Sequence, residues 1–553
     1  MAGNARCDIL IVGGGLGGCA AAMAACSMGK RVILTEETDW IGGQLTAQLV
    51  PPDEHPWIEQ FGCTARYRRY RECVRQYYRD HRPLTAEACH NPLLNPGGGW
   101  VSRLCHEPAI GHEVLRSMLQ AFVERGFLEI RLRYVPIGAE IDGAPILIDT
   151  SRPKARQEGS GERVRSVEFL DLDSGERSMV EANYFIDATE LGELLPMTGT
   201  SYAIGAEAKT ETEEPHAVDG PPEWNNVQGL TWCMAMGLDE GSHRVIDCPE
   251  TYERWRNYQP SFWPGPLLGF DVLHAHTGQP VKLPLFSSHW YALFPYRQIV
   301  NPAAFTEPTL PATVVNWPQN DYFLDTILDV DDFLDFTPGV PLARGSVSAV
   351  RLLDAQELSK CLLYWLQTEA PRHDGGVGYP GLYLRADLAG TADGFAKTAY
   401  IRESRRILAQ RPVLEQDVTT ECNPSLDRAP SFDDSVGIGA YRIDLHPSTS
   451  GENTFDASTL PFEIPMGALI PQQMRNLLPA CKNLGVTHIT NGCYRLHPVE
   501  WNIGESAGAL AAFCVDAGLE PLQVYQDSTK RHAYQDVLQR QGIELRWPQL
   551  RPL

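Results

Sequence analysis

A glycine-rich turn between two apolar segments constrains the fold of this chain more than any other sequence feature. Residues 8–12 are mostly apolar, which is typical of a strand buried on both faces. Three glycines with the spacing G-x-G-x-x-G follow: Gly13, Gly15 and Gly18. Residues 17–28 are rich in alanine and predict a helix, and a second apolar segment, 31–35, ends next to Glu36. This order predicts a β–α–β unit with two parallel strands.

The three glycines and the glutamate have the positions that a dinucleotide site needs. In such a site the first glycine allows a tight turn, the second lets a pyrophosphate approach the backbone, and the third lets the helix pack against the strand. The pyrophosphate lies at the helix N-terminus, where free N–H groups and the helix dipole favour negative charge. Glu36 lies 18 residues after Gly18, near the offset of about 20 residues at which an acid binds the ribose. The sequence therefore predicts that a dinucleotide binds here.

Charge and composition exclude several kinds of partner. The chain has 553 residues, of which 43% are hydrophobic and 21% charged, as in globular proteins. Its net charge of −23 argues against nucleic acid and against an anionic membrane as partners. No apolar run reaches the roughly 18 residues that a membrane-spanning helix needs. Only Arg6 supplies a basic residue ahead of the first apolar run, unlike a secretion signal, so we expect a cytoplasmic protein.

The cysteines and histidines give no metal-binding pattern. The fourteen cysteines include no C-x-x-C pair, so the sequence predicts neither a zinc site nor a four-cysteine iron–sulfur cluster. We expect most of them to be small core residues in a reducing compartment. His446, His488 and His497 do not have a spacing typical of metal ligands. We therefore predict no metal site.

The character of the sequence changes along the chain. Residues 1–200 predict a nucleotide-binding sheet that carries an inserted antiparallel layer. Residues 201–465 are rich in proline and aromatic residues and predict a substrate or cap domain on a mixed sheet. Residues 466–525 return to the first style, and residues 526–553 form a tail. The predicted fold class is α/β, with a Rossmann-type domain that contains a β-meander and with a mixed α+β cap domain.

Local patterns predict the further elements. Helices are predicted at 63–79, 108–124, 251–258, 348–367, 394–410 and 502–517. Strands are predicted at 128–135, 164–172, 178–182, 184–188 and 476–480, with a hairpin tip at 157–161. Residues 481–499 are predicted to be a polar loop.

With these elements placed, the chain resembles the FAD-dependent oxidoreductases that have a glutathione-reductase-type FAD domain. More narrowly, it resembles the heterodisulfide-reductase A-like flavoproteins. The resemblance covers nearly the whole chain. It is carried by the glycine turn, Glu36, Gly42, Gly43, residues 186–199 and residues 487–508. It implies that FAD binds noncovalently, with residues 1–200 and 466–525 as the two parts of the FAD-binding domain.

The resemblance also implies roles for single residues. Asp187 is expected to contact the ribityl or pyrophosphate region of FAD. The late helix is expected to place its N-terminus, near Ile503 and Gly504, against the flavin pyrimidine ring. Gln44 directly follows the Gly42–Gly43 turn, in a loop that we expect to pass near the flavin edge.

Two departures from the family pattern bear on the electron acceptor. The cluster-binding cysteines of the heterodisulfide-reductase relatives are missing. A second strand–GxGxxG–helix unit is also missing, because Gly437-x-Gly439 precedes a strand-like segment. We therefore expect oxygen, a quinone or a carrier protein, and not NAD(P)H bound in its own domain, to exchange electrons with the flavin.

The segment before the late helix has the densest set of polar residues. Removal of a hydride from an alcohol or amine needs a base with a pKa near neutral, and His497 or His488 is our candidate. Arg495 is the candidate for a substrate clamp or for stabilising negative charge on the flavin. The alternative is that these residues hold the loop together by hydrogen bonds.

Two further polar groups stay open. Arg402, Arg405 and Arg406 have helical spacing and could bind a substrate carboxylate, although ion pairs with nearby acids are the preferred interpretation. The loop that contains Gln48 and Asp53 could contact the substrate.

The sequence thus predicts an FAD-dependent dehydrogenase or oxidase that oxidises a small organic molecule by hydride transfer to the flavin. An enzyme that consumes NAD, like the thiazole-forming enzymes, and a flavin subunit of an electron-transfer complex remain the alternatives. The sequence does not identify the substrate or the oligomeric state.

Overall fold

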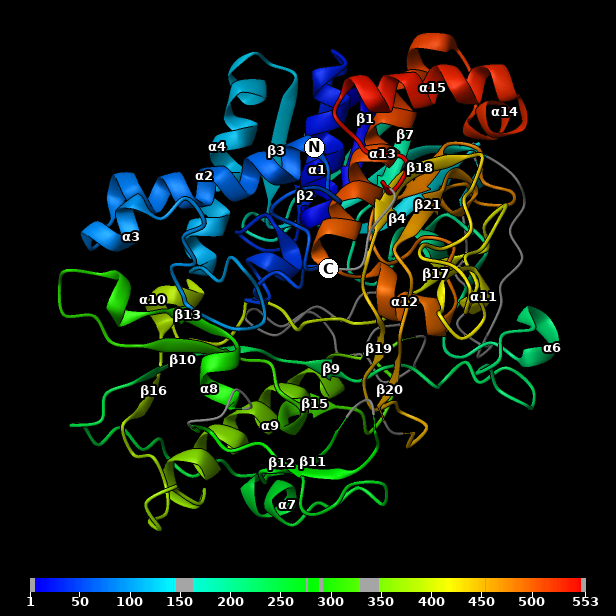
Figure 1. Ribbon diagram of the computed structural model, residues 1–553. Coiled ribbons are helices and arrows are strands. Elements are labelled where there is room, and N and C mark those ends of the chain that lie inside the picture. Colours follow the sequence, from blue (N-terminus) through cyan, green and yellow to red (C-terminus); the bar gives the residue numbers. More distant parts are fainter. Residues whose placement is uncertain are drawn as a thin grey trace.

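The computed structural model describes residues 5–142, 144–145, 163–274, 277–287, 292–328, 348–452 and 454–548. One half of the molecule contains a large sheet with long helices, and the other contains a smaller sheet with one long helix (Figure 1). The hairpin tip predicted at 157–161 lies outside the described residues.

The large sheet has eight described strands in the order β3-β2-β1-β7-β6-β4-β5, with β22 also paired to β7. Its strands are β1 (Ala5–Val12), β2 (Val32–Glu36), β3 (Leu128–Leu132), β4 (Tyr134–Ile141), β5 (Ala144–Pro145), β6 (Val164–Asp171), β7 (Arg177–Asp187) and β22 (Leu477–Pro479). Five of these strands form a parallel part of the sheet, in the order β3, β2, β1, β7 and β22. This confirms the predicted β–α–β unit and the Rossmann-type α/β class.

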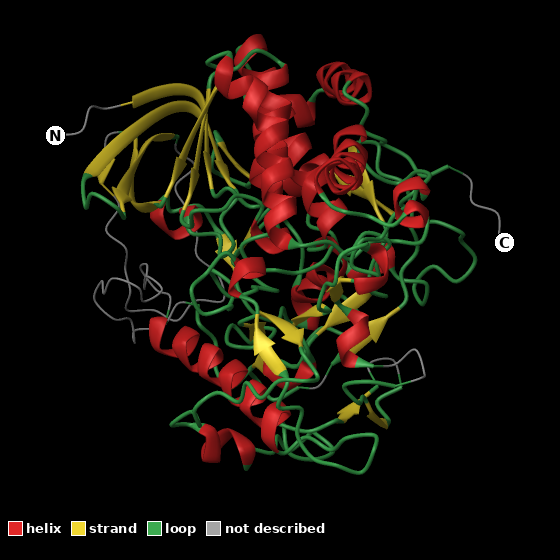
Figure 2. Cartoon of the chain, turned by 90° about the vertical axis from the view of Figure 1, so that its left-hand side faces the viewer, coloured by secondary structure: helices red, strands yellow, loops and turns green. Residues whose placement is uncertain are grey.

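Both faces of β1 are buried, which explains the apolar run that predicted it. Ile9 and Ile11 point into one hydrophobic core, and Leu10 and Val12 point into the other. Side chains alternate along a strand, so a strand covered on both sides needs apolar residues at successive positions. Figure 2 shows the curved sheet with helices packed against it.

The antiparallel layer is inserted between β3 and the second half of β7. Strand β6 pairs with β4 and with the first part of β7 in antiparallel fashion. Residues 185–187 of β7 instead pair with β22, so two strands share one edge of β7. The inserted β-meander is therefore confirmed, but the strands predicted at 178–182 and 184–188 are one strand. The strand predicted at 128–135 is two strands, because the chain takes a left-handed conformation at Arg133 (φ 58°).

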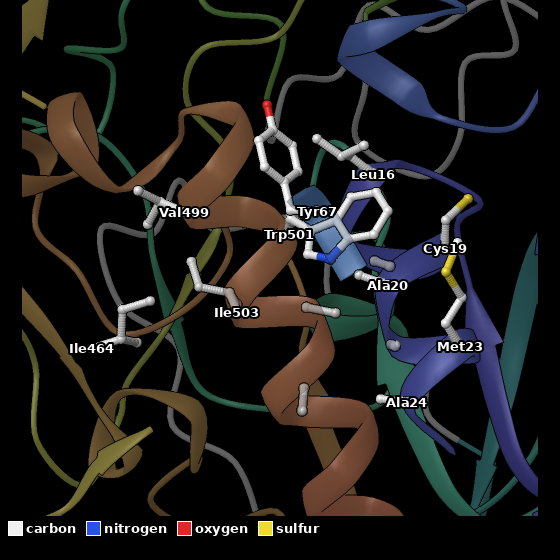
Figure 3. Packing of buried hydrophobic residues seen from close by; sticks show 14 of the residues in the cluster. Leu16, Cys19, Ala20, Met23, Ala24, Tyr67, Ile464, Val499, Trp501 and Ile503 are labelled. Carbon is white, nitrogen blue, oxygen red and sulfur yellow. The ribbon is translucent and has the colours of Figure 1, made fainter. Parts of the chain in front are cut away.

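Helices α1 (Leu16–Ser27) and α13 (His497–Ala517) come from opposite ends of the chain and pack along each other (Figures 1 and 3). Their contact depends on small residues. A Cβ atom on Gly504 would lie 2.0 Å from the carbonyl oxygen of Gly17, and one on Gly508 would lie 2.2 Å from that of Ala21. Figure 3 shows Leu16, Ala20 and Ala24 of α1 facing α13. The backbones therefore approach each other more closely than larger side chains would allow.

Other helices surround this pair. They are α2 (Ala65–His81), α3 (Ala86–His90), α4 (Pro108–Glu124), α12 (His488–Tyr494), α14 (Pro521–Gln526) and α15 (Ser528–Arg540). Helix α4 has the predicted bounds. Residues 481–499 are not one polar loop, since they contain α12 and the start of α13. Proline at position 498 does not prevent helix formation there, because the first turn needs no N–H donor from it.

The second half of the molecule contains the antiparallel sheet β13-β14-β10-β16, so the mixed sheet predicted here is wrong. The strands are β10 (Met234–Leu238), β13 (Gln298–Val300), β14 (Ala312–Val315) and β16 (Leu382–Leu384). Its long helix, α9 (Ala349–Thr368), agrees with the predicted helix 348–367. The helix predicted at 394–410 is absent from these described residues, which form turns and β17 (Arg406–Ile407).

Short elements complete the described chain. The helices are α5 (Leu194–Met197), α6 (Lys209–Thr212), α7 (Tyr252–Arg256), α8 (Leu293–Tyr296), α10 (Ala386–Ala389) and α11 (Glu415–Val418). The strands are β8 (Tyr202–Ala203), β9 (Leu230–Thr231), β11 (Asp271–Leu273), β12 (Pro280–Lys282), β15 (Asp321–Tyr322), β18 (Ser435–Gly439), β19 (Ile443–Leu445), β20 (Phe455–Ala457) and β21 (Phe462–Pro465). Among the described residues, no helix has the length and apolar character needed to cross a membrane.

Candidate active site

The glycine turn lies at the carboxyl end of β1, against the loop that follows β7. Gly13 has φ +100°, and a Cβ atom there would lie 2.2 Å from the carbonyl oxygen of Ala188. A Cβ atom on Gly18 would lie 2.1 Å from the carbonyl oxygen of Gly13. Only glycine fits these two positions, so the turn packs closely between β1 and the loop after β7.

A cavity lies beside this turn. Its lining includes Gly13, Gly15, Thr35, Glu36, Gly43 and Gln48. The hydroxyl of Thr35 and both amide atoms of Gln48 are buried and have no hydrogen-bond partner among the described residues. Buried polar groups are normally paired, so these atoms indicate that a polar ligand binds in the cavity. These unpaired donors and acceptors fit a polar cofactor such as FAD.

Glu36 lies at the end of β2, where the sequence placed the ribose-binding acid. Its carboxylate accepts hydrogen bonds from the backbone N–H of Gly14 (2.8 Å) and from the N–H and hydroxyl of Thr38 (both 2.9 Å). Burial, together with the charge of Glu37, raises the pKa of Glu36 to about 8. A ribose hydroxyl could use the remaining hydrogen-bonding capacity of this group.

Asp187 shapes the cavity without lining it. Its carboxylate accepts hydrogen bonds from the N–H and hydroxyl of Thr189 (3.0 and 2.7 Å) and from the N–H of Leu194 (3.1 Å). Burial raises the pKa of Asp187 to about 6. The side chain thus folds the loop in which Ala188, Thr189 and Glu190 line the cavity. The carboxylate oxygens of Asp187 point toward its own loop. This geometry therefore does not favour the direct contact with FAD that was expected from the resemblance.

A buried lysine that the sequence analysis missed lies next to the glycine turn. Lys482 forms an ion pair with Glu190, whose carboxylate lies 3.2 Å from a Cβ position on Gly15. Burial lowers the pKa of Lys482, but the negative charges of Glu190 and Glu500 outweigh this and raise it. A buried cation is therefore held beside the glycine turn. Only its position after β22 could have indicated this role.

Glu500 connects this region with the Gly42–Gly43 turn. It accepts a hydrogen bond from the N–H of Gly17 (3.1 Å) and one from the side-chain amide of Gln44. The Gln44 amide also donates to the carbonyl oxygen of Arg495 (3.1 Å), and its own oxygen has no partner among the described residues. Gln44 therefore lies between the glycine turn and the segment before α13.

The start of α13 differs from the expectation. The helix begins at His497, so Ile503 and Gly504 lie inside it and not at its N-terminus. Gly504 contacts the backbone of Gly17 through the close packing of α1 and α13. The residues that could present a helix N-terminus to a ligand are instead His497 to Val499.

His497 is completely buried and bonded to backbone at both ring nitrogens. Its Nδ1 accepts a hydrogen bond from the N–H of Asp53 (3.0 Å), so Nε2 carries the proton and donates to the carbonyl oxygen of Val50 (3.2 Å). Burial lowers the pKa of His497 to about 3. No lone pair remains for a substrate proton, and the ring fixes the loop of residues 50–53.

His488 belongs to a buried ionic network. Its Nδ1 lies 2.9 Å from a carboxylate oxygen of Glu403, which also pairs with Arg406. Burial lowers the pKa of His488, but Glu403 outweighs burial and raises it. Arg406 also pairs with Glu207 (2.7 Å), and Arg402 pairs with Asp321 (3.0 Å). Ion pairs, and not a free carboxylate clamp, thus occupy Arg402 and Arg406; Arg405 donates to the carbonyl oxygen of Leu191 (3.0 Å).

A second cavity, an open cleft, lies at the end of the 50–53 loop. Its lining includes Asp53, His55, Tyr296, Tyr441, Arg442 and Thr459. A carboxylate oxygen of Asp53 lies 3.8 Å from Nη1 of Arg297. The Nε and Nη1 groups of Arg297 have no hydrogen-bond acceptor among the described residues. The cleft is therefore lined by an acid, Asp53, that is only loosely paired with the neighbouring Arg297.

Arg495 lies behind this cleft. It donates to the hydroxyl of Tyr400 (2.7 Å) and to the carbonyl oxygen of Asp444 (3.0 Å), and its Nε is buried without a partner among the described residues. Burial lowers the pKa of Arg495, but Tyr400 and Asp444 together have the larger effect, so the pKa of Arg495 is raised. Arg495 thus keeps its charge in the interior.

A histidine–aspartate pair lies close to Arg495. His446 places Nδ1 2.6 Å from Asp321 and Nε2 3.8 Å from Asp444. Burial raises the pKa of Asp321, but Arg402 and His446 outweigh it and keep it below its usual value. In the part of the chain that the structure describes, no three histidine, cysteine or acidic side chains are grouped to hold a metal ion.

Comparison with known proteins agrees with this geometry. The model of the family "FAD dependent oxidoreductase" matches residues 8–538. No curated protein sequence matches the chain. Solved structures that share 15% identity include L-proline dehydrogenase from P. horikoshii (34% of this chain and 24% of that one, TM-score 0.17). Others are a myxobacterial chondrochloren halogenase (44% and 45%, TM-score 0.22) and THI4 from Thermovibrio ammonificans (37% and 67%, TM-score 0.20).

The chain spans less than half the length of the first two of these solved structures, and the TM-scores are too low to say anything about its function. The family model, in contrast, covers nearly all of the sequence, including the glycine turn, both cavities and α13. The chain therefore belongs to the family of FAD-dependent oxidoreductases, and it is an enzyme with FAD as its cofactor.

Proposed function

We propose that this enzyme oxidises a small organic molecule, bound in the cleft, by hydride transfer to FAD. The observation that carries the proposal is that one loop borders both cavities. Gln48 offers an unpaired amide to the FAD cavity, and Asp53, five residues later, lines the cleft. Bound FAD supplies the two-electron acceptor. The protein then has to bind the substrate, orient it and accept its proton.

The residues proposed to hold FAD are those of the glycine turn, together with Glu36, Gly43, Gln44, Gln48 and Lys482. Asp187 and Gly504 act by shaping the loop and the helix pair around them. We also propose the division into an FAD domain, 1–200 with 466–525, and a cap domain, 201–465. The cleft supports it, because its lining joins Asp53 and Val101 of the first part to Tyr296 and Tyr441 of the second.

Arg495 remains our candidate for stabilising negative charge on the reduced flavin. Its buried, unpaired Nε and its link to Gln44 support this role. We propose positioning roles for His497 and His488, because hydrogen bonds to backbone occupy the first and Glu403 holds the second. The electron acceptor is proposed to be oxygen, a quinone or a carrier protein.

Absorption spectroscopy tests the proposal. The purified protein should be yellow, and a panel of sugars, amines and hydroxy acids should include a compound that bleaches the flavin without oxygen. A panel that leaves the flavin oxidised, in protein whose flavin dithionite can reduce, would contradict substrate oxidation. A colourless protein that holds an adenine nucleotide would instead support the NAD-consuming alternative.

A further inference from the structure

The cleft contains one acid whose environment differs from that of the others. Asp53 is 6% exposed, and its carboxylate receives no hydrogen bond from the described residues; its closest cation, on Arg297, is 3.8 Å away. Glu54, the next residue, instead pairs with Arg71 and accepts from Ser102 (3.0 Å). Asp321 accepts from Thr231 and pairs with Arg402. Asp53 is therefore the acid in this region with unused hydrogen-bonding capacity that faces the cleft.

His497 fixes the backbone of Asp53. Its ring accepts the N–H of Asp53 and donates to the carbonyl oxygen of Val50, which ties both ends of the 50–53 segment to the start of α13. The ring itself is completely buried. A carboxylate that is to meet a substrate needs such a rigid support, because a misplacement of about 1 Å can cost two orders of magnitude in rate.

We propose that Asp53 accepts the substrate proton during oxidation and that His497 is its positioning residue. This inference rests on the proposed function. The substrate carbon gives a hydride, with both electrons of its C–H bond, to the bound FAD. The proton of the neighbouring O–H or N–H group goes to the Asp53 carboxylate, and a C=O or C=N bond forms. Asp53 later returns that proton to solvent through the cleft.

The electrostatic surroundings agree with this role. Burial raises the pKa of Asp53, whereas Arg297 and Arg495 lower it, so the group stays above its usual value. The charged groups that face it are Arg297, Arg442, Asp444 and Arg495. The tyrosines that face it are Tyr296, Tyr400 and Tyr441. A base is most effective when its pKa approaches the working pH, and burial moves Asp53 in that direction.

The first test compares Asp53→Asn with Asp427→Asn, which changes an exposed acid. The probe is the compound of the panel that bleaches wild-type flavin fastest. Asp53→Asn should bind FAD with an unchanged spectrum, reduce it about 10²–10⁴-fold more slowly, and lose the acidic limb of the pH profile. Asp427→Asn should behave like the wild type. Equal rates and equal pH profiles for Asp53→Asn and wild type would overturn the proposal.

A second measurement does not depend on turnover. An infrared pH titration of the FAD-loaded protein should show a carboxyl C=O band that is present in Asp427→Asn and absent from Asp53→Asn. Formate should restore part of the rate to Asp53→Ala, which also serves if Asp53→Asn does not fold. A band that persists in Asp53→Asn, or no rescue by formate, would overturn the assignment.

The positioning role has its own test. His497→Gln should slow flavin reduction and shift the acidic limb, whereas the double variant with Asp53→Asn should be no slower than Asp53→Asn alone. Additive losses would overturn the link between the two residues. If no compound bleaches the wild type, the proposed function fails; if the wild type is bleached and Asp53→Asn is equally fast, only this inference fails.

Discussion

Replacing Gly504 with alanine tests whether the contact between α1 and α13 sets the shape of the cofactor turn. The new Cβ atom would lie 2.0 Å from the carbonyl oxygen of Gly17. Carbon–oxygen contacts in proteins are normally about 3.3 Å or longer, so the two helices would have to separate by about 1.3 Å. Gly17 lies in the first turn of α1, so this movement would displace the backbone of the glycine turn.

The size of the effect follows from the packing. Overpacking of a well-packed core typically costs about 1–3 kcal/mol. Because the new Cβ atom would meet a backbone atom, we expect Gly504→Ala to lower the free energy of unfolding by about 3 kcal/mol. The affinity for FAD should fall by at least about tenfold, which corresponds to about 1.4 kcal/mol. Urea unfolding of the FAD-free protein and fluorescence titration with FAD measure the two quantities.

The control for this variant is Gly265→Ala. A Cβ atom on Gly265 has no neighbour within 4 Å, so this change should leave both quantities within about 0.5 kcal/mol of the wild type. If Gly504→Ala behaves like Gly265→Ala, the close contact does not support the cofactor turn, and the reasoning is wrong.

Three further predictions concern buried charges. Because burial lowers the pKa of His497 to about 3, the unfolded chain binds a proton below pH 6.5 that the folded chain does not. Between pH 6.5 and about pH 5 the free energy of unfolding should therefore fall by about 2 kcal/mol more in the wild type than in His497→Gln, and equal slopes in urea titrations would contradict this. Lys482→Met should weaken FAD binding by about 10–100-fold in fluorescence titration, since it removes the cation beside Glu190, and unchanged affinity would show that Lys482 does not face the pyrophosphate. Arg71→Met leaves Glu54 without its buried cation, whereas Glu59 keeps Arg75, and should lower the free energy of unfolding by about 3–5 kcal/mol. Arg69→Met, which removes an exposed pair with Glu72, should change it by less than about 1 kcal/mol, and similar losses in the two variants would refute the distinction.

Sequence analysis correctly predicted the parts of the fold that depend on residues close to one another in the sequence. The apolar run of β1, the spacing of the three glycines and the alanine-rich α1 each depend on residues within a few positions of one another. The positive φ of Gly13 and the close contact of Gly18 explain why these residue types are needed. The start of α13 was placed too late, because the polar residues before position 502 hid a helix whose first turn contains proline.

The cleft could not be predicted, because its residues come from distant parts of the chain. Asp53, Arg297 and Arg495 follow no common spacing, and their proximity depends on how the two halves of the molecule pack. The helix predicted at 394–410 failed for a related reason. Its arginines have helical spacing, but each is held by acids or carbonyl groups that lie elsewhere in the sequence, such as Asp321 and Glu207. Tertiary ion pairs can therefore imitate the charge pattern of a surface helix.

The shared edge of β7 has a consequence for how the protein is made. Strand β22 and helix α13 leave the ribosome roughly 15–60 s after β7, at the usual 5–20 residues per second. Until then the upper part of β7 lacks its neighbour, and the small-residue face of α1 is exposed to the cell. During this interval the nucleotide-binding fold of the nascent chain is incomplete and exposes apolar surface. Chaperones that bind apolar segments should meet this protein at that stage, and FAD should enter only after synthesis is nearly complete.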